Sequence, residues 1–230
     1  MKIPLSNRLL ACCNFVAPGD RVADVGCDHG YLGIHLLRSG IASSVIASDI
    51  NEGPLSCAVR NSEKYGVRDR ISFYLSDGVR NIPREFDTLI CAGMGGDTMV
   101  SILSAAPWLK SPQYRLILQC QSKTPMLRQY LSETGWRIME ESVLRDGKFL
   151  YTVMEVVWQP GHSLTPGECH FPPALLENPS AHLSAYYRWV IKGLETTVNN
   201  QKENADPLKV QALQELKSLP PELNWLKEEL

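Results

Sequence analysis

Long apolar runs are the first feature that this 230-residue sequence lacks. No stretch approaches the roughly 20 consecutive apolar residues that a bilayer-spanning helix needs, so we expect no membrane segment. Near the N-terminus, Asn7, Arg8 and Asn14 interrupt any signal-peptide core. Compositions typical of disorder or of collagen are absent too, because 44% of the residues are hydrophobic and 21% are charged. The sequence predicts a soluble globular protein of roughly one to two domains.

Regular cysteine spacing is also missing. The seven cysteines are scattered, none forms a C-x-x-C pair, and Cys12 and Cys13 are adjacent. This pattern argues against a disulfide framework and against a structural zinc site. We therefore expect no metal and a reducing, cytoplasmic location.

The net charge of −2 does not point to a polyanionic partner. Residues 1–157 hold 17 Lys and Arg against 16 Asp and Glu, whereas residues 158–230 hold six against nine. Local patches, more than the total charge, set the affinity for nucleic acid, so a phosphate-binding face stays possible.

Strand-like and helix-like segments alternate through the first 157 residues. The β-branched runs predict buried parallel strands at Val22–Gly26, Ser44–Ile50, Ile71–Ser76, Thr88–Cys91 and Arg115–Cys120. Helical patterns lie between them, at Tyr31–Arg38, Pro54–Tyr65, Asp97–Leu103 and Pro125–Glu133. This alternation predicts βαβ crossovers and an α/β fold with a doubly wound sheet.

After Gly135 the pattern changes. Two strand-like runs, Arg137–Leu144 and Phe149–Trp158, are joined by the turn sequence Arg-Asp-Gly-Lys. They predict a hairpin that gives the sheet an antiparallel edge. Residues 159–173 are rich in Pro and Gly and predict a linker. We therefore divide the chain into a domain of residues 1–158 and a C-terminal part of residues 159–230.

The C-terminal part predicts two helices. Apolar residues recur at helical or heptad spacing, as Leu183, Tyr187, Val190 and Leu194 in the first helix and Leu208, Leu213 and Leu216 in the second. Two interpretations stay open: a small coiled-coil-like α-helical hairpin, or an amphipathic pair laid on the first domain.

Acidic residues follow three successive predicted strands. Ligands of an open α/β sheet bind outside the carboxyl ends of its strands. The first strand leads into Asp-Val-Gly-Cys-Asp-His-Gly, which is not the dinucleotide fingerprint G-x-G-x-x-G and carries Asp at positions 24 and 28. A pyrophosphate would face two carboxylates there, whereas S-adenosylmethionine carries a sulfonium and an ammonium group and no phosphate. Gly26 lets the backbone approach such a ligand closely.

Asp49 ends the second strand, and Asp77 follows the third. A carboxylate at the first position can accept both ribose hydroxyls, and one at the second can accept an adenine amino group. Each Asp alone is equally explained as a helix cap or a turn residue. Three acids in this order, with Gly26 beside the first, favour an adenosyl cofactor.

Four motifs, DVGCDHGYLGIHLL, ASDINEGPL, LSDG and DTLICAGMGGDTM, resemble the bacterial tRNA (adenine-22-N1)-methyltransferases. These are class I S-adenosyl-L-methionine-dependent enzymes with a Rossmann-like domain and a C-terminal helical domain. The resemblance runs from Leu5 to about Trp158. The C-terminal helical pair resembles the family's helical domain in its predicted secondary structure more than in its amino-acid sequence. It implies that the cofactor is S-adenosyl-L-methionine and that the partner is tRNA.

The resemblance also implies a role for each matching residue. The methionine part of the cofactor would lie against Asp24, Gly26 and Asp28, the ribose against Asp49 and Asn51, and the adenine against Asp77 and Gly78. The loop Ala92-Gly93-Met94-Gly95-Gly96 would border the methyl group.

This loop bears on the position that is methylated. Methyltransferases that act on the exocyclic amine of adenine usually carry an Asn-Pro-Pro-Tyr-like loop here, and AGMGG offers no such side chains. Ring N1 has an in-plane lone pair, so its attack on the methyl group needs alignment more than a general base. Alignment can contribute about 7–11 kcal/mol. Nearby carboxylates or carbonyls would stabilise the cationic product. The loop is therefore consistent with methylation at N1.

The adenine must be unpaired or turned out of its stack, because N1 lies on the Watson–Crick edge. His29 and Tyr31 directly follow the cofactor turn, and given the resemblance we predict that they contact this base beside Met94. Capping and helix packing are the ordinary alternatives for the two. Phe149 and Tyr151 are second candidates for an aromatic wall, and strand packing explains them equally well.

Basic residues near predicted loops and helix ends are candidates for phosphate contacts. They are Arg8, Lys123, Arg128, Arg145 and Lys148. A helix opening with Ser6-Asn7-Arg8 would place Arg8 over the cofactor mouth.

Two other functions stay open: the same fold acting on a small molecule or a protein, and a cofactor-sensing RNA-binding module without turnover. We expect a monomer or a weak dimer.

Overall fold

The computed structural model describes residues 3–201 and 204–228. Its centre, within these residues, is a seven-stranded sheet in the order β3-β2-β1-β4-β5-β7-β6. The strands are β1 (Arg21–Val25), β2 (Ser44–Asp49), β3 (Ile71–Leu75), β4 (Thr88–Gly95), β5 (Arg115–Ser122), β6 (Trp136–Asp146) and β7 (Phe149–Trp158). The pairs among β1 to β5 are parallel, and β7 pairs antiparallel with both β5 and β6. The predicted α/β fold with an antiparallel hairpin is confirmed.

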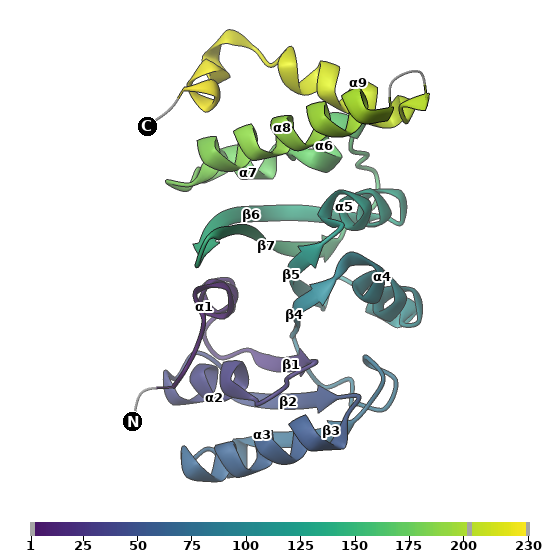
Figure 1. Ribbon diagram of the computed structural model, residues 1–230. Coiled ribbons are helices and arrows are strands. Elements are labelled where there is room, and N and C mark those ends of the chain that lie inside the picture. Colours follow the sequence, from purple (N-terminus) through teal and green to yellow (C-terminus); the bar gives the residue numbers. More distant parts are fainter. Residues whose placement is uncertain (1–2, 202–203, 229–230) are drawn as a thin grey trace.

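Helices cover both faces of the sheet (Figure 1). Helices α1 (Asn7–Cys13), α2 (Tyr31–Arg38) and α3 (Glu52–Lys64) contribute to one buried cluster, and α4 (Gly96–Ser104) and α5 (Thr124–Glu133) contribute to another. The alternation of strand side chains explains this division. On β5, Ile117 belongs to the first cluster, whereas Leu116 and Leu118 belong to the second. Two short 3₁₀ turns, η1 (Arg68–Arg70) and η2 (Pro107–Leu109), complete this part.

The C-terminal helices lie beyond strand β6 (Figure 1). They are α6 (Pro166–His170), α7 (Ala174–Glu177), α8 (Leu183–Gln201), α9 (Pro207–Lys217) and the 3₁₀ segment η4 (Pro221–Lys227). Their buried cluster includes Val143 of β6, so the helices share a core with the hairpin. Helices α8 and α9 pack against each other, with the Tyr187 hydroxyl donating to the carbonyl oxygen of Leu216, and α7 packs on β6. Leu208, expected on the packed face of α9, is 52% exposed.

The segment predicted as a linker, residues 159–173, contains helix α6, so that prediction was wrong for Pro166–His170. Thr165 and Glu168 form a capping box in which each side chain accepts a hydrogen bond from the other residue's backbone N–H. Pro166 occupies the first helical position, where the missing N–H costs nothing. The Thr-x-x-Glu signal was present in the sequence.

None of the helices among the described residues combines the length and apolar character that crossing a bilayer takes.

Arg128 was the wrong candidate for a phosphate contact. Its side chain is fully buried, with Nη2 2.6 Å from Oε1 of Glu141. It also donates hydrogen bonds to the carbonyl oxygens of Cys169 and His170 and to the hydroxyl of Tyr186. A buried guanidinium with all these partners is structural, because phosphate cannot reach it. It joins α5 and β6 to α6 and α8.

Candidate functional site

A cavity of about 290 Å³ opens at the carboxyl end of β1. It lies between α1, the β1–α2 turn and the end of β4. Most of the residues predicted for the methionine end of the cofactor and for the substrate base meet here. The lining consists of Arg8, Leu9, Asp24, Gly26, Cys27, Asp28, His29, Tyr31, Leu32, Ala92 and Gly93.

The β1–α2 turn is built on left-handed backbone conformations. Gly26 has φ +72°, and a Cβ atom on it would lie 2.3 Å from Cε of Met94. Glycine adopts this left-handed conformation without strain, whereas a residue with a side chain would be strained there and would displace the flexible end of Met94. The backbone N–H groups of Gly26 and Cys27 both donate to the carbonyl oxygen of Ser48 on β2. The turn is therefore held rigidly against its neighbouring strand.

Asp24 is a buried acid in the cavity wall. Its residue is 4% exposed, and its Oδ2 atom has no hydrogen-bond partner among the described residues. Burial, with a smaller contribution from the charge of Asp49, raises the pKa of the Asp24 carboxyl to about 7. A cationic ligand group would supply the missing partner. The environment of Asp24 thus fits the ammonium group of the predicted cofactor.

Asp49 connects two segments of the site. Its Oδ2 accepts the N–H of Asp28 at 3.1 Å, and its Oδ1 accepts the N–H of Asn51 at 2.9 Å. The carboxylate is nearly buried, whereas Asn51 is exposed at the start of α3. Each carboxylate oxygen keeps a second lone pair, so these bonds leave capacity for ribose hydroxyls.

The end of β3 contributes residues on the same edge of the sheet but outside the lining of this cavity. Asp77 is half-exposed, and its Oδ2 lies 3.3 Å from Nη1 of Arg80. Gly78 has φ +60°, and a Cβ there would lie 3.0 Å from Ile102. Because β3 pairs with β2, these two residues lie on the side of Asp49 away from β1.

The end of β4 is held by Gln119, a residue that the sequence analysis missed. Its Oε1 accepts the N–H of Gly93 at 3.0 Å and a hydrogen bond from Nη1 of Arg8 at 3.3 Å. Gln119 is fully buried in β5. A lone amide inside the apolar run Leu-Ile-Leu-Gln-Cys was the available signal. The segment Ala92–Gly95, expected as a loop, is a bulged extension of β4.

Arg8, on α1, is one of the lining residues of the cavity. Besides its bond to Gln119, its Nε atom is 3.6 Å from Oδ2 of Asp146 in the hairpin turn. Nδ2 of Asn7 donates to the carbonyl oxygen of Arg145 in the same turn. These contacts fasten α1 to the hairpin and hold it over the end of β4.

His29 and Tyr31 stand together at the cavity rim. Their ring centroids are 5.9 Å apart, and the ring of Tyr65 lies 6.4 Å from that of Tyr31. The carbonyl oxygen of His29 accepts a hydrogen bond from Asn61 on α3, which fixes the turn. Both rings are partly or largely exposed, so a planar ligand can reach them.

The other predicted substrate residues do not line this cavity. Lys123 forms an ion pair with Asp97 at 2.7 Å, and the ammonium of Lys148 lies 5.3 Å from the ring centroid of Phe149. Arg145 and Phe149 are exposed near the hairpin tip. Tyr151 lines a second cavity, between β7 and α8.

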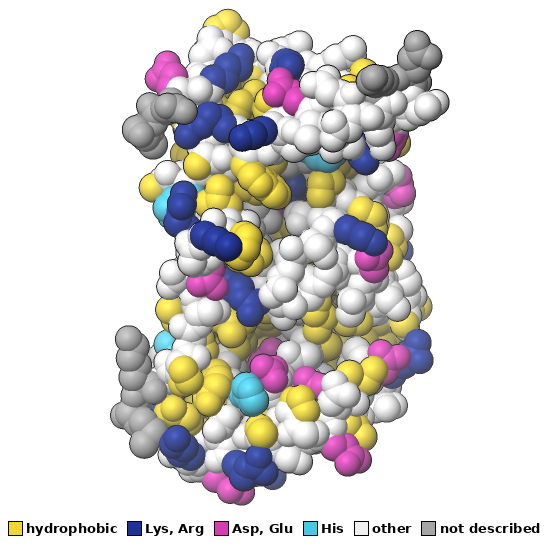
Figure 2. All heavy atoms as spheres, in the orientation of Figure 1, with side chains coloured by type: hydrophobic (Ala, Val, Ile, Leu, Met, Phe, Trp, Pro, Cys, Tyr) yellow, Lys and Arg dark blue, Asp and Glu magenta, His cyan; other side chains and the backbone are white. Residues whose placement is uncertain are grey.

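Charged side chains of both signs lie on the face shown in Figure 2. In its upper half, where the hairpin and the C-terminal helices lie, several Lys and Arg side chains have apolar side chains between them. Acidic side chains and a histidine border a hollow lower down, and further Lys and Arg side chains lie at the lower end. Among the described residues, no three His, Cys, Asp or Glu side chains are grouped as a metal site would require.

We compared the chain with known proteins to find which family has this sheet and cavity. Residues 5–154 match the family model described as a methyltransferase domain. The chain belongs to this methyltransferase family. The match covers the sheet from before β1 into β7, and with it every residue of the cavity lining.

The names of individual relatives are more specific than the description of the family model. The tRNA (adenine(22)-N(1))-methyltransferase of Bacillus subtilis (strain 168) is 32% identical over 154 residues, which are 66% of this chain and 65% of that enzyme. A putative tRNA methyltransferase of Mycoplasma genitalium is 30% identical over 138 residues, 59% of this chain and 61% of the relative. The chain thus spans less than two thirds of the length of these curated relatives.

Solved structures match over nearly the whole chain. The B. subtilis m1A22 tRNA methyltransferase TrmK superposes with a TM-score of 0.78 at 26% identity, covering 98% of both chains. Streptococcus pneumoniae Sp1610, solved in complex with S-adenosyl-L-methionine, has a TM-score of 0.80 at 29% identity, covering 93% of this chain and 98% of that one. The likeness therefore extends through the C-terminal helices.

Proposed function

We propose that this chain is a tRNA methyltransferase that transfers a methyl group from S-adenosyl-L-methionine to N1 of adenine 22. The observation that carries the proposal is the buried Oδ2 atom of Asp24, which lacks a hydrogen-bond partner and lies beside Gly26 at the carboxyl end of the first strand. The names of the B. subtilis relative and of its solved structure support the substrate. We also propose a cytoplasmic location, because the substrate is tRNA.

Cofactor binding is assigned to the carboxyl edge of the first four strands. Asp24 accepts the ammonium group, and Asp28 lies beside it. Asp49 and Asn51 hold the ribose, and Asp77 and Gly78 hold the adenine. Ala92, Gly93 and Met94 border the methyl group. When bound, S-adenosyl-L-methionine supplies an electrophilic methyl group on sulfur, which N1 attacks directly.

The residues of the chain then have to orient the base. His29 and Tyr31 offer it two neighbouring rings at the rim, and Arg8 is placed above the end of β4. N1 needs no base to remove a proton before attack, since its lone pair is free. The product adenine is cationic, and the nearby carboxylates of Asp28 and Asp49 lower the energy of that charge. Positioning is therefore the main contribution of the site.

One experiment tests the reaction and its position together. The full chain is incubated with S-adenosyl-L-methionine and an unmodified tRNA transcript, followed by nucleoside mass spectrometry and reverse-transcription mapping. We expect 1-methyladenosine and a stop at position 22. A transcript with guanosine at position 22 is the matched control and should stay unmodified. 1-Methyladenosine elsewhere would overturn the position, and no methylated nucleoside despite cofactor binding would overturn the substrate.

A further inference from the structure

A second cavity, of about 300 Å³, lies between the sheet and the C-terminal helices. The roles assigned above do not use it. Its lining comes from the end of β5, the start of α5, strand β7 and helices α6, α8 and α9. The residues that matter for its chemistry are Lys123, Tyr151, Thr152, Trp189, Gly193 and Lys209.

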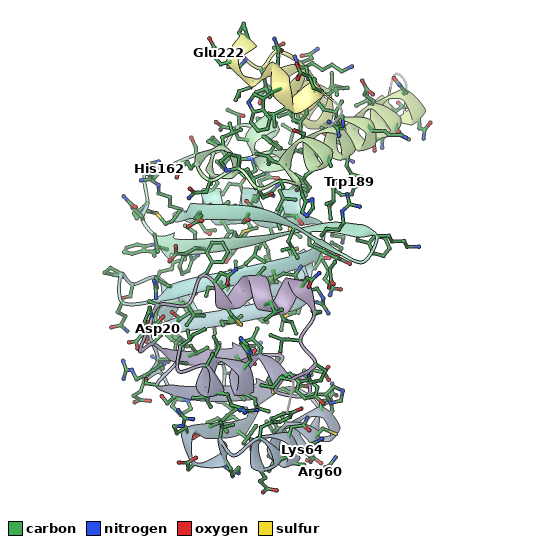
Figure 3. All side chains as sticks on the ribbon, turned by 90° about the vertical axis from the view of Figure 1, so that its left-hand side faces the viewer. Asp20, Arg60, Lys64, His162, Trp189 and Glu222 are labelled. Atoms are coloured by element: carbon green, nitrogen blue, oxygen red, sulfur yellow. The ribbon has the colours of Figure 1, made fainter. Side chains whose placement is uncertain are left out.

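An aromatic row ends at this cavity. Trp189 is 62% exposed, and its ring lies 5.7 Å from that of Tyr186 at an interplanar angle of 31°. Tyr186 in turn stacks on Phe171 at 6.3 Å. Figure 3, in which Trp189 is labelled, places it at the junction between α8 and the strands. A large, exposed ring on a rigid support offers a surface on which another planar group can stack.

A buried polar atom in the same lining lacks a partner. Thr152 is 2% exposed, and its Oγ1 has no hydrogen-bond partner among the described residues. Buried hydroxyl groups are nearly always hydrogen-bonded, because an unpaired one costs free energy. A hydroxyl can both donate and accept, so it can pair with either kind of atom on the edge of a base.

The charge of the lining suits a nucleotide. Lys123 and Lys209 contribute ammonium groups, of which that of Lys123 is paired with Asp97 outside the lining, and no Asp or Glu is among the described lining residues. Burial lowers the pKa of His170 to about 4, so this ring is neutral at pH 7 and is available as a hydrogen-bonding group. An aromatic surface with two cations at its margin is the usual composition of a site for single-stranded nucleic acid.

The two cavities are neighbours along the carboxyl edge of the sheet. Gln121 lines the second cavity, and its Nε2 lies 3.5 Å from where a Cβ of Gly93 would be. Gly93 lines the first cavity. A strand of RNA whose one base reaches the first cavity therefore has the second within reach.

We propose that the second cavity holds another unpaired nucleobase of the same tRNA. The base stacks on Trp189, pairs through its edge with Thr152 Oγ1, and has its phosphates near Lys123 and Lys209. This inference rests on the proposed function, because it takes tRNA as the substrate. It makes α8 part of the substrate site.

A substitution at Gly193 tests the cavity by filling it. Gly193 lies in the lining, on α8, and a Cβ there meets nothing within 4 Å. Gly193→Phe therefore blocks the cavity, whereas Gly193→Ala is the matched control that leaves it open. Binding of unmodified tRNA by the full chain is measured without cofactor, by fluorescence anisotropy. We expect Gly193→Phe to weaken binding about tenfold or more and Gly193→Ala to change it less than twofold.

Two further variants separate a binding role from a structural one. Trp189→Ala removes the stacking surface and should weaken tRNA binding about tenfold, with unchanged affinity for S-adenosyl-L-methionine as the check on folding. Thr152→Val keeps the shape and removes the unpaired hydroxyl. It should weaken tRNA binding severalfold while raising the melting temperature, a combination that a purely structural Thr152 would not give.

The possible failures are distinguishable. If Gly193→Phe and Trp189→Ala bind tRNA as Gly193→Ala does, the cavity proposal is overturned and the methylation proposal stands. If the unaltered chain binds tRNA but transfers no methyl group, the proposed reaction is overturned, and the same binding comparison still decides on the cavity. Absence of tRNA binding by the unaltered chain overturns both.

Discussion

Arg128 and Glu141 form a bidentate ion pair in which neither side chain is exposed. Nη2 of Arg128 lies 2.6 Å from Oε1 of Glu141, and Nε donates to Oε2 at 3.1 Å. The pair joins α5 to the edge strand β6. Because the same guanidinium also binds two carbonyl oxygens of α6, the attachment of the C-terminal helices depends on it.

Arg128→Met should destabilise the fold strongly. The substitution leaves the Glu141 carboxylate buried without its partner, which costs about 3–5 kcal/mol in comparable cases. Urea unfolding measures the change in free energy. The matched control is Arg21→Met, which breaks an ion pair with Asp87 in which both side chains are 40–49% exposed. That change should cost much less, because solvent screens an exposed ion pair, and equal losses in the two variants would contradict the argument.

Gly26→Ala should weaken cofactor binding beyond its effect on stability. An alanine there adopts a left-handed conformation, at a cost of about 1–2 kcal/mol, and displaces Met94. Gly40→Ala is the control, because Gly40 has nearly the same φ of +71° and nothing within 4 Å of its Cβ position. Both variants should lose similar stability in thermal unfolding. Calorimetric titration with S-adenosyl-L-methionine should show lower affinity for Gly26→Ala alone.

The Asp24 carboxyl should make stability depend on pH. Its pKa rises on folding, from 3.8 to about 7. Between these values the folded chain keeps a proton that the unfolded chain has lost, so this group lowers the free energy of unfolding as pH rises from about 4 to about 7. Asp24→Asn cannot ionise and should remove this slope. It should be more stable than the unaltered chain at pH 8, and parallel pH profiles of unfolding would show that another group is responsible.

Cofactor binding should release a proton from the same residue. A bound ammonium group stabilises the ionised form of Asp24 and so lowers its pKa. Affinity for S-adenosyl-L-methionine should therefore increase between pH 6 and 7.5. Calorimetry at pH 6 in two buffers of different ionisation enthalpy counts the protons. An equal heat in both buffers would exclude Asp24 as the partner of the ammonium group.

Asp49 should be more sensitive to substitution than Asp77. Asp49→Ala removes the acceptor of two backbone N–H groups and of the ribose, so methyl transfer should be lost while circular dichroism shows a retained fold. Asp49→Asn keeps one acceptor oxygen, and its affinity for the cofactor should fall about tenfold. Asp77→Asn changes a half-exposed carboxylate, so its affinity for the cofactor should fall less than that of Asp49→Asn. A larger loss at position 77 would reverse the assigned roles.

The sheet and its hairpin were predictable from local patterns. Short β-branched runs and a turn such as Arg-Asp-Gly-Lys carry their own structural signal, and strands β1 to β5 lie within a few residues of the predicted ranges. The acids at strand ends were predictable too, because parallel strands bring their carboxyl ends to one edge. Asp24, Gly26 and Asp28 accordingly share one cavity.

The sequence does not reveal which side chains contact one another when they are far apart along the chain. Nothing local shows that Arg128 meets Glu141 on a different element, so a buried structural cation was interpreted as a surface one. The role of Gln119 likewise depends on its hydrogen bonds with Arg8 and Gly93, which are 111 and 26 residues away in the sequence. Tyr151 was predicted to contact the substrate, and only the folded arrangement of α8 and β7 shows that it lines a cavity separate from that of Asp24.

The position of β7 has a consequence for synthesis on the ribosome. β7 lies between β5 and β6, so β6 leaves the ribosome before β7, with which it pairs. Until residue 158 has emerged, β5 remains an open edge of an otherwise complete parallel sheet, able to pair with another nascent chain. The helices that bury Val143 of β6 follow later still. The open edge of β5 is therefore exposed to misassembly for the interval between the emergence of β5 and that of β7.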